Sequence, residues 1–447
     1  MAITGWFVLL VAAGAVPIIA IGEPWVLPTW LVVCVAIGAV DAALAPSPRD
    51  LTVSRTVPPR ARLGETVQAT VTIANPQRRT AHLAVRDAWR PSAGAHPTRQ
   101  RLTVPGGERR TLTTDLTPFR RGAIPGAEVT IRSFGPLRLV ARQVSFSAPG
   151  TLTVLPRFAS RRHLPSRLAR LRELDGSASV QLRGQGTEFD SLREYVRGDD
   201  VRSIDWRASA RRTGTAERAA RHGGGTIVQP ELVVRTWRPE RDRRVVVLVD
   251  SGRSAAARIG DETRLDTAFE TALLVGALAS AAGDRVDLAI HDRRLRGRVR
   301  GAKGAELLAK MVDVMATVEP ELIEPDWSAV PQLIRSTTSQ RALVVLCTTA
   351  ESPEAARALL AVLPELTREH LVLVASVDDP AILAATRRRS TSAELAVAAA
   401  AERALVERGR LAAAIRTLGA DVVSAAPADL PPAVADRYLA YKAAGRL

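Results

Sequence analysis

The sequence predicts a multidomain chain with an apolar helical hairpin, a β-sandwich and a doubly wound α/β domain, in that order. Two uncharged apolar runs open the chain, at Ile3–Ile21 and Trp25–Val40. Short β-branched runs with alternating polarity then continue to Leu155. From Arg244 onward, continuous apolar runs alternate with longer helical patterns, which is typical of a parallel sheet covered by helices on both faces.

The domain boundaries are placed where these patterns change. The hairpin takes residues 1–45, the β-sandwich residues 50–156, a connector residues 157–240 and the α/β domain residues 241–447. A chain of 447 residues is long enough for two or three domains with complete cores.

Both apolar runs are predicted to insert in a membrane. The first run has 19 residues without a charge, which suits a hydrocarbon core of about 30 Å. The second is short unless it extends to Leu44, which brings Asp41 to the interface. Arginines follow it from Arg49 onward, whereas the turn between the runs carries only Glu23. By the positive-inside rule we expect a multi-pass protein of the cell membrane with both termini and most of the chain in the cytoplasm. A buried helical hairpin of a soluble domain is the alternative.

The middle segment predicts a β-sandwich, immunoglobulin-like in layout, because short strands recur between proline and glycine turns. The expected strands are Thr66–Ile73, Ala81–Val85, Arg109–Leu116 and Ala127–Ile131. The segment shows no catalytic constellation, so we interpret it as a spacer or a binding module.

In the α/β domain the expected strands are Val245–Val249, Val286–Ile290, Leu343–Cys347, Leu371–Val377 and Val422–Val423. Ser352 and Pro353 form an N-cap and first-turn pair, which predicts a helix from there to Thr367. Ligands of doubly wound sheets bind at the carboxyl ends of the strands.

The net charge of +16 is spread along the chain. No arginine block interleaves with aromatics, so we expect an anionic lipid surface rather than a nucleic acid as the partner of this charge. The two cysteines, Cys34 and Cys347, allow no disulfide framework and no metal-ligand spacing.

The stretch from Gly184 to Arg211 has neither a strand nor a helix period, and mixes glycines, acids, arginines and aromatics. Within it, Phe189–Val196 is predicted to be helical and Gly198–Asp200 to form a turn. It resembles the signature of a bacterial family known as domain-of-unknown-function family 58, with the pattern G-x-G-x-E-F-x-x-L-R-x-Y-x-x-G-D-D-x-R-x-I-D-W-x-x-x-A-R. The matching residues are Gly184, Gly186, Glu188, Phe189, Leu192, Arg193, Tyr195, Gly198, Asp199, Asp200, Arg202, Ile204, Asp205, Trp206, Ala210 and Arg211.

The resemblance implies a membrane hairpin, a β-rich segment and a von Willebrand A-like α/β domain. It also implies that the protein acts together with a MoxR-type AAA+ ATPase. In von Willebrand A domains the first strand ends in D-x-S-x-S, which helps to hold a divalent cation. Asp250 and Ser254 match this motif, but Gly252 replaces the middle hydroxyl. Arg253 adds a positive charge, and Thr348-Thr349-Ala350 stands after the strand Leu343–Cys347, where a later acid is expected. We therefore expect no cofactor, because Mg²⁺ needs a nearly complete octahedron of oxygens; Asp250 instead caps a helix or bonds Arg253.

Three roles remain open for the signature. As a clasp between the β domain and the α/β domain, its arginines would neutralise its acids while Tyr195 and Trp206 pack beneath them. As a docking surface, it would bind a partner protein. As an enzyme site, it would use Glu188, Asp199 or Asp205, although no histidine lies within it and each acid has an arginine close in sequence.

The function that we expect first is a non-enzymatic, membrane-anchored cytoplasmic scaffold or adaptor. The resemblance implies that it works with a MoxR-type AAA+ ATPase in the assembly or maturation of a protein complex whose identity is open. The chain itself has no Walker phosphate loop. The alternative is metal-dependent ligand binding or adhesion through Asp250 and Ser254, and the third class is an enzyme.

Overall fold

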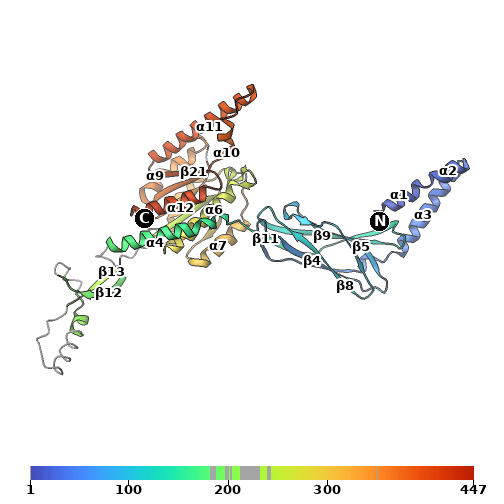
Figure 1. The fold of residues 1–447 in the computed structure, drawn as a ribbon, viewed down its shortest axis with the longest axis horizontal. Helices are drawn as coiled ribbons and strands as arrows, with labels where there is room; N and C mark the ends of the chain where they lie inside the picture. Colours follow the sequence, from blue (N-terminus) through green and yellow to red (C-terminus); the bar gives the residue numbers. More distant parts are fainter. Residues whose placement is uncertain are drawn as a thin grey trace. The chain divides into compact units, whose positions relative to one another are not determined.

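The computed structural model describes residues 2–181, 188–196, 201, 204–211, 232–238, 243–349 and 351–447, with backbone alone at 175–181, 188–191, 193 and 235–238. The chain divides into two compact units (Figure 1). One comprises Met1–Arg157 with Met311–Glu319, and the other comprises Phe158–Lys310 with Pro320–Leu447.

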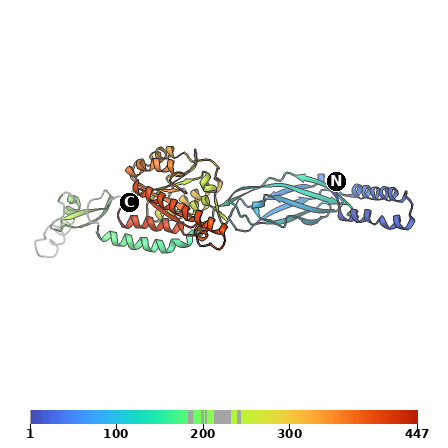
Figure 2. The ribbon, with the colours of Figure 1, turned by 90° about the horizontal axis from the view of Figure 1, so that it is seen from above.

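The N-terminal apolar runs form α1 (Gly5–Ala12), α2 (Ala15–Ile21) and α3 (Val26–Leu44). Figures 1 and 2 show α1 and α3 side by side. The Trp30 indole N–H donates to the Leu10 carbonyl at 3.3 Å, and a Cβ at Gly14 would lie 2.2 Å from the Trp30 ring. A small residue thus lets the two segments approach closely. By length and composition, α3 is the candidate membrane anchor in the described chain, whereas Gly5–Ile21 is shorter.

The carboxylate of Asp41, near the end of α3, joins this helix to the β-rich part of the same unit. Asp41 is fully buried. Its two oxygens accept the backbone N–H groups of Leu137 and Leu139, each at 2.8 Å, and of Val140 at 3.1 Å. The turn before β10 is therefore held on the helix by three charge-assisted hydrogen bonds, which are stronger than neutral ones. Asp41, which the sequence placed near the end of the second apolar run, is thus buried inside this junction.

Residues 51–155, together with the short strand β1 at the start of the chain, form two sheets that enclose a shared core. One sheet has the order β2-β4-β8-β6. The other contains β1-β10-β9-β11-β3, with β5 pairing both β7 and β9. Buried residues of both sheets, such as Ile73 and Leu83, meet between them. The bounds are β1 Ala2–Ile3, β2 Thr52–Thr56, β3 Arg60–Arg62, β4 Val67–Ala74, β5 Ala81–Trp89, β6 Ala95–His96, β7 Gln100–Val104, β8 Arg109–Leu116, β9 Gly122–Phe134, β10 Val140–Phe146 and β11 Thr151–Leu155.

The α/β domain is built on a six-stranded sheet of order β18-β17-β14-β19-β20-β21. All neighbours are parallel except β17 and β18. Alternate residues along a strand point to opposite faces, and Val246, Val344 and Val372 pack with α8, α9 and α11 in one core. The strands are β14 Arg244–Asp250, β17 Arg285–His291, β18 Leu295–Val299, β19 Leu343–Cys347, β20 Leu371–Val377 and β21 Asp421–Ala425.

Helices α6 and α12 pack together against this domain, with α4 beside them (Figure 1). A capping box between Thr263 and Asp266 begins α6, and Arg167 of α4 pairs with Asp436 of α12 at 2.7 Å. The helices are α4 Leu164–Gln181, α6 Arg264–Ala281, α7 Gly304–Thr317, α8 Val330–Thr337, α9 Arg357–Glu369, α10 Pro380–Ala385, α11 Ser392–Thr417 and α12 Leu430–Ala443. The predicted α/β architecture is confirmed.

Two local predictions were wrong. The stretch Phe189–Val196 is not helical: β12 (Glu188–Glu194) pairs antiparallel with β13 (Val233–Arg238), with a bulge between Phe189 and Ser191. The partner strand lies far along the sequence, so a local pattern did not reveal the pairing. The helix predicted from Ser352 begins only at Arg357; Ser352 instead accepts the Ala355 N–H within a turn.

The Asp41 junction predicts a specific loss of protection from solvent. Replacing Asp41 by Ala leaves three backbone N–H groups without their acceptor, and each such buried group costs about 1–3 kcal/mol. We expect the full chain in detergent to lose roughly 3 kcal/mol of stability. The amides of Leu137, Leu139 and Val140 should exchange hydrogen faster, as measured by mass spectrometry. Asp50→Ala, which changes an exposed acid nearby, is the matched control; equal protection in both variants would contradict the assignment.

Candidate functional site

The carboxyl edge of the α/β sheet brings together polar residues from three neighbouring strands. β14 ends at Asp250, β17 ends at His291 and is followed by Asp292, and β19 is followed by Thr348. Because β14 lies between the other two strands, these positions share one edge, where doubly wound folds bind ligands.

Asp250 is enclosed by hydrogen bonds from its own surroundings. It is 2% exposed. One carboxylate oxygen accepts the Gly252 N–H at 2.7 Å. The other accepts the hydroxyls of Ser254 at 3.0 Å and Thr348 at 2.7 Å. Burial raises the pKa of Asp250 above its usual range, although these hydrogen bonds act in the opposite direction.

Asp292 forms a second closed group beside it. Its carboxylate accepts the Ser251 hydroxyl at 3.1 Å, an Arg296 guanidinium N–H at 3.2 Å and the Arg294 backbone N–H at 3.1 Å. Burial opposes ionisation, but the hydrogen bonds and the Arg296 charge outweigh it and lower the pKa of Asp292. Burial also lowers the pKa of His291, which favours the neutral imidazole.

Gly252, the residue that departs from the D-x-S-x-S pattern, is required by packing. A Cβ at this position would lie 2.8 Å from the Ile323 carbonyl oxygen and 3.0 Å from an Asp250 oxygen. A serine would therefore force the loop apart. Arg253 does not bond Asp250, contrary to one expectation from the sequence: it pairs with Glu324 at 2.7 Å on the exposed surface.

This edge does not fit a divalent cation. The space beside Asp250 is about 10 Å³, which is about the volume that one water needs. Both oxygens of Asp250 already accept hydrogen bonds. Among the described residues, no group of three or more His, Cys, Asp or Glu side chains is placed to hold a metal ion. Asp250 and Ser254, the two residues that match the motif, are hydrogen-bonded to each other.

Part of the signature lies outside the described residues: Gly184, Gly186, Gly198, Asp199, Asp200 and Arg202. Glu188, Phe189 and Arg193 lie in β12. The Tyr195 N–H donates to the Leu232 carbonyl at 2.8 Å, which continues the pairing beyond β12.

Asp205 caps the helical turn of residues 206–211. Its carboxylate accepts the backbone N–H groups of Arg207 and Ala208, both at 3.0 Å. Ser209 ties this turn to β13, because its hydroxyl donates to the Asp205 carbonyl at 2.8 Å and accepts the Val233 N–H at 2.9 Å. Asp205 thus has a backbone-capping role that the predicted network of carboxylates and guanidinium groups did not include.

The predicted packing of Trp206 beneath the charges is wrong, because Trp206 is 63% exposed. Other apolar side chains of the signature are exposed too: Leu192 by 44%, Val196 by 61% and Val201 by 59%. Arg211 also lies at the surface. Of the two aromatics that the sequence assigned to a clasp, Trp206 therefore faces outward, whereas Tyr195 is half-buried.

Sequence reasoning did not single out Ser251, Asp292, Thr348 or Ser209. Ser251, Asp292 and Thr348 are the first residues after β14, β17 and β19. A polar residue just after each predicted strand was therefore a signal that could have identified them. Ser209 gave none, because its role depends on β13, which is distant in sequence.

The raised pKa of Asp250 predicts a pH-dependent difference from Asp250→Asn. A carboxyl whose folded pKa exceeds its unfolded value of 3.8 loses stability as pH rises above that value. We therefore expect the wild type to lose stability relative to Asp250→Asn between about pH 4 and pH 7, measured by urea unfolding of the full chain. Asp261→Asn, which changes an exposed acid, should follow the wild type. A constant difference between Asp250→Asn and wild type across this range would refute the assignment.

Comparison with solved structures gives similarities at low identity. Salmonella alpha-2-macroglobulin (mutant Y1175G) matches 24% of this chain at 16% identity and a TM-score of 0.18, and the chain covers 7% of that protein. The CARDB domain of a Pyrococcus furiosus protein, in complex with di-metal ions, matches 24% of this chain and 92% of that domain, at 17% identity and a TM-score of 0.18. The SpRpn10 VWA domain matches 44% of this chain and 94% of that domain, at 11% identity and a TM-score of 0.28.

The search of curated proteins found no match. A family model does match residues 191–223 and 225–384, which include the second half of the signature, β13 and the α/β domain as far as α10. Over these residues the chain matches the model of the family described as protein of unknown function DUF58.

Proposed function

We propose that this protein is a non-enzymatic, membrane-anchored adaptor that docks a MoxR-type AAA+ ATPase through its signature, in the assembly or maturation of another protein complex. The observation that carries the proposal is the exposure of Trp206, together with that of Leu192, Val196 and Val201 in the same stretch. Tryptophan is enriched among the residues that dominate binding energy at interfaces.

The local structure supports a docking role for this stretch. Residues 204–211 are held by the Asp205 cap and by Ser209. Trp206 is therefore presented from an ordered turn, and binding through it costs less conformational entropy than binding through a loose segment. The type of ATPase comes from the family resemblance of the signature.

The closed carboxyl edge supports an adaptor over metal-dependent adhesion. Asp250 would have to give up the Thr348 and Ser254 hydroxyls before it could ligate a cation. The same closure counts against an enzyme site at this edge, because the buried acids Asp250 and Asp292 already accept hydrogen bonds from neighbouring groups.

We further infer that α1 and α2 enter the membrane together with α3, as a hairpin with both termini in the cytoplasm. Large apolar side chains such as Leu9, Ile19 and Val32 are at least 61% exposed on these helices. Such surfaces are costly in water and favourable in lipid. The arginine excess after α3 supports the orientation.

The docking proposal predicts a large effect of one substitution. Trp206→Ala should weaken capture of the ATPase from detergent extracts under ATP-trapping conditions by roughly 30-fold, as for a residue that dominates an interface. The unfolding midpoint should stay near that of the wild type, because the side chain is mostly exposed. Quantitative mass spectrometry of the captured proteins gives the first value and thermal unfolding gives the second.

Two valines with similar exposure test whether capture of the ATPase depends on the signature or on exposed apolar surface in general. Val201 is 59% exposed in the signature and Val397 is 57% exposed on α11. Val201→Ala should reduce capture, and Val397→Ala should not. If Trp206→Ala and Val201→Ala unfold early with capture intact, the signature is a structural clasp and the docking proposal fails.

The orientation is tested by a reporter fused after Leu447. A reporter that is active only in the cytoplasm should be active in this fusion, because the arginines after α3 keep that flank on the cytoplasmic side. Replacing Arg49, Arg55, Arg60 and Arg62 by Gln should raise the fraction of inverted molecules. Activity of the wild-type fusion only outside the cytoplasm would overturn the orientation.

A further inference from the structure

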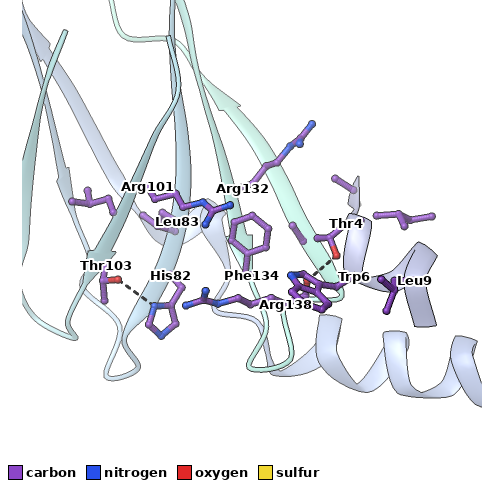
Figure 3. Close-up of a pocket in the computed structure, with 15 residues that line it drawn as sticks. Thr4, Trp6, Leu9, His82, Leu83, Arg101, Thr103, Arg132, Phe134 and Arg138 are labelled. Carbon is purple, nitrogen blue, oxygen red and sulfur yellow. Dashed lines mark hydrogen bonds between the residues drawn. The ribbon is translucent and has the colours of Figure 1, made fainter. Parts of the chain in front are cut away.

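A pocket of about 640 Å³ lies where α1 begins, beside the sheet that contains β5, β9 and β10 (Figure 3). Its apolar lining includes Leu83 and Phe134 on the sheet and Trp6 and Leu9 on α1. This volume is in the usual range for a small-molecule site. The pocket therefore joins the β-rich part of this unit to the apolar helix that precedes it.

Three arginines, Arg101, Arg132 and Arg138, line the pocket together with the side chains of His82 and Thr103. Figure 3 shows Arg101 beside Phe134. Arg132 bonds Gln143 at 2.8 Å, whereas Arg101 and Arg138 form no ion pair with any described residue. Two guanidinium groups without a carboxylate partner therefore line one cavity.

The positive lining continues into a neighbouring pocket of about 440 Å³. Both pockets share Arg101, Arg132 and Phe134, and the second adds Arg86 and Arg99. Among the described residues that line the two pockets, none is acidic. The combined surface therefore attracts anions, and guanidinium groups bind phosphate with bidentate geometry.

The backbone at Arg138 supports a built site. Arg138 has a φ of 56°, a left-handed conformation that is uncommon outside glycine and costs free energy. The Thr4 hydroxyl contacts the carbonyl oxygens of Arg138 at 2.8 Å and Leu139 at 2.9 Å, and Asp41 holds the amides on both sides of Arg138. These bonds from Thr4, which precedes α1, and from Asp41 of α3 keep Arg138 at the pocket in a conformation that the residue does not favour by itself.

We propose that this pocket binds the phosphate group of an anionic ligand, supplied by a phospholipid headgroup or by a small soluble phosphate ester. Arg101 and Arg138 contact the phosphate oxygens, and Thr103 and His82 add polar contacts. Trp6 and Leu9, which are 65% and 61% exposed, accommodate an apolar chain when the ligand is a lipid. The lipid case rests on the membrane insertion of α1 inferred above, whereas the arginine pair does not.

The experiment uses the full chain in detergent, with native mass spectrometry to measure retained ligand. Dioleoyl phosphatidylglycerol, dioleoyl phosphatidylcholine, glycerol 3-phosphate and inorganic phosphate are titrated separately. The lipid source predicts one tightly held phosphatidylglycerol that glycerol 3-phosphate does not displace. The soluble source predicts glycerol 3-phosphate binding with little preference for phosphatidylglycerol.

Substitutions connect either result to the pocket. Removing a positive charge near an anionic surface weakens attraction by about fivefold, so Arg101→Gln with Arg138→Gln should weaken binding by about 25-fold. Arg109→Gln removes an exposed charge from β8, in the other sheet, and should leave binding unchanged. All variants are expected to unfold like the wild type without ligand.

The outcomes separate the site from the membrane inference. Equal binding by wild type and by the double variant, for all four ligands, would overturn the site. Equal weakening by Arg109→Gln would also overturn it, because the effect would then be one of general charge. Recovery of the chain in the aqueous phase after detergent phase separation would overturn insertion of α1. The phosphate site would then be decided by the binding of glycerol 3-phosphate and inorganic phosphate.

Discussion

A carboxylate buried away from water needs hydrogen bonds on both oxygens, and this requirement organises the protein at two places, one in each compact unit. Asp41 meets it with three backbone N–H groups of one turn. Asp250 meets it with one backbone N–H group and two hydroxyls. In the first case the requirement joins the apolar helix α3 to the β-rich part of its unit. In the second case it closes the edge of a sheet where a ligand would otherwise bind.

The closure at Asp250 depends on several residues together. Thr348 supplies a hydroxyl donor in the stretch where the motif would have an acid, and Gly252 allows the loop to approach the Ile323 carbonyl. An acid at position 348 would place two buried carboxylates in contact, and like charges at that distance raise the pKa of one of them strongly. A side chain at position 252 would push the loop away. The departures from the metal-binding pattern are therefore mutually consistent. They favour a binding site on the molecular surface over one at the sheet edge.

The sequence predicted the elements whose pattern is local and strong. Continuous apolar runs gave β14, β19 and β20 to within a residue, because a parallel strand buried on both faces has no other pattern. It failed at Phe189–Val196, where pairing with β13 overrides a weak helical spacing, and at Ser352, whose hydroxyl bonds a turn instead of a helix. The antiparallel edge strand β18 was missed, since two arginines alternate through its five residues and such charged edges hide a strand pattern.

The site residues divide in the same way, into those with a local sequence signal and those whose role depends on distant strands. Asp250 and Ser254 were found from a motif, but their partner Thr348 becomes adjacent only through the order of the strands. Trp206 was assigned to a buried position because large aromatics usually lie inside. Its exposure has a physical cause in the chain: Asp205 caps the turn through its side chain while Ser209 anchors that turn to β13. The bonds that order the turn are thus polar, and none of them involves the indole.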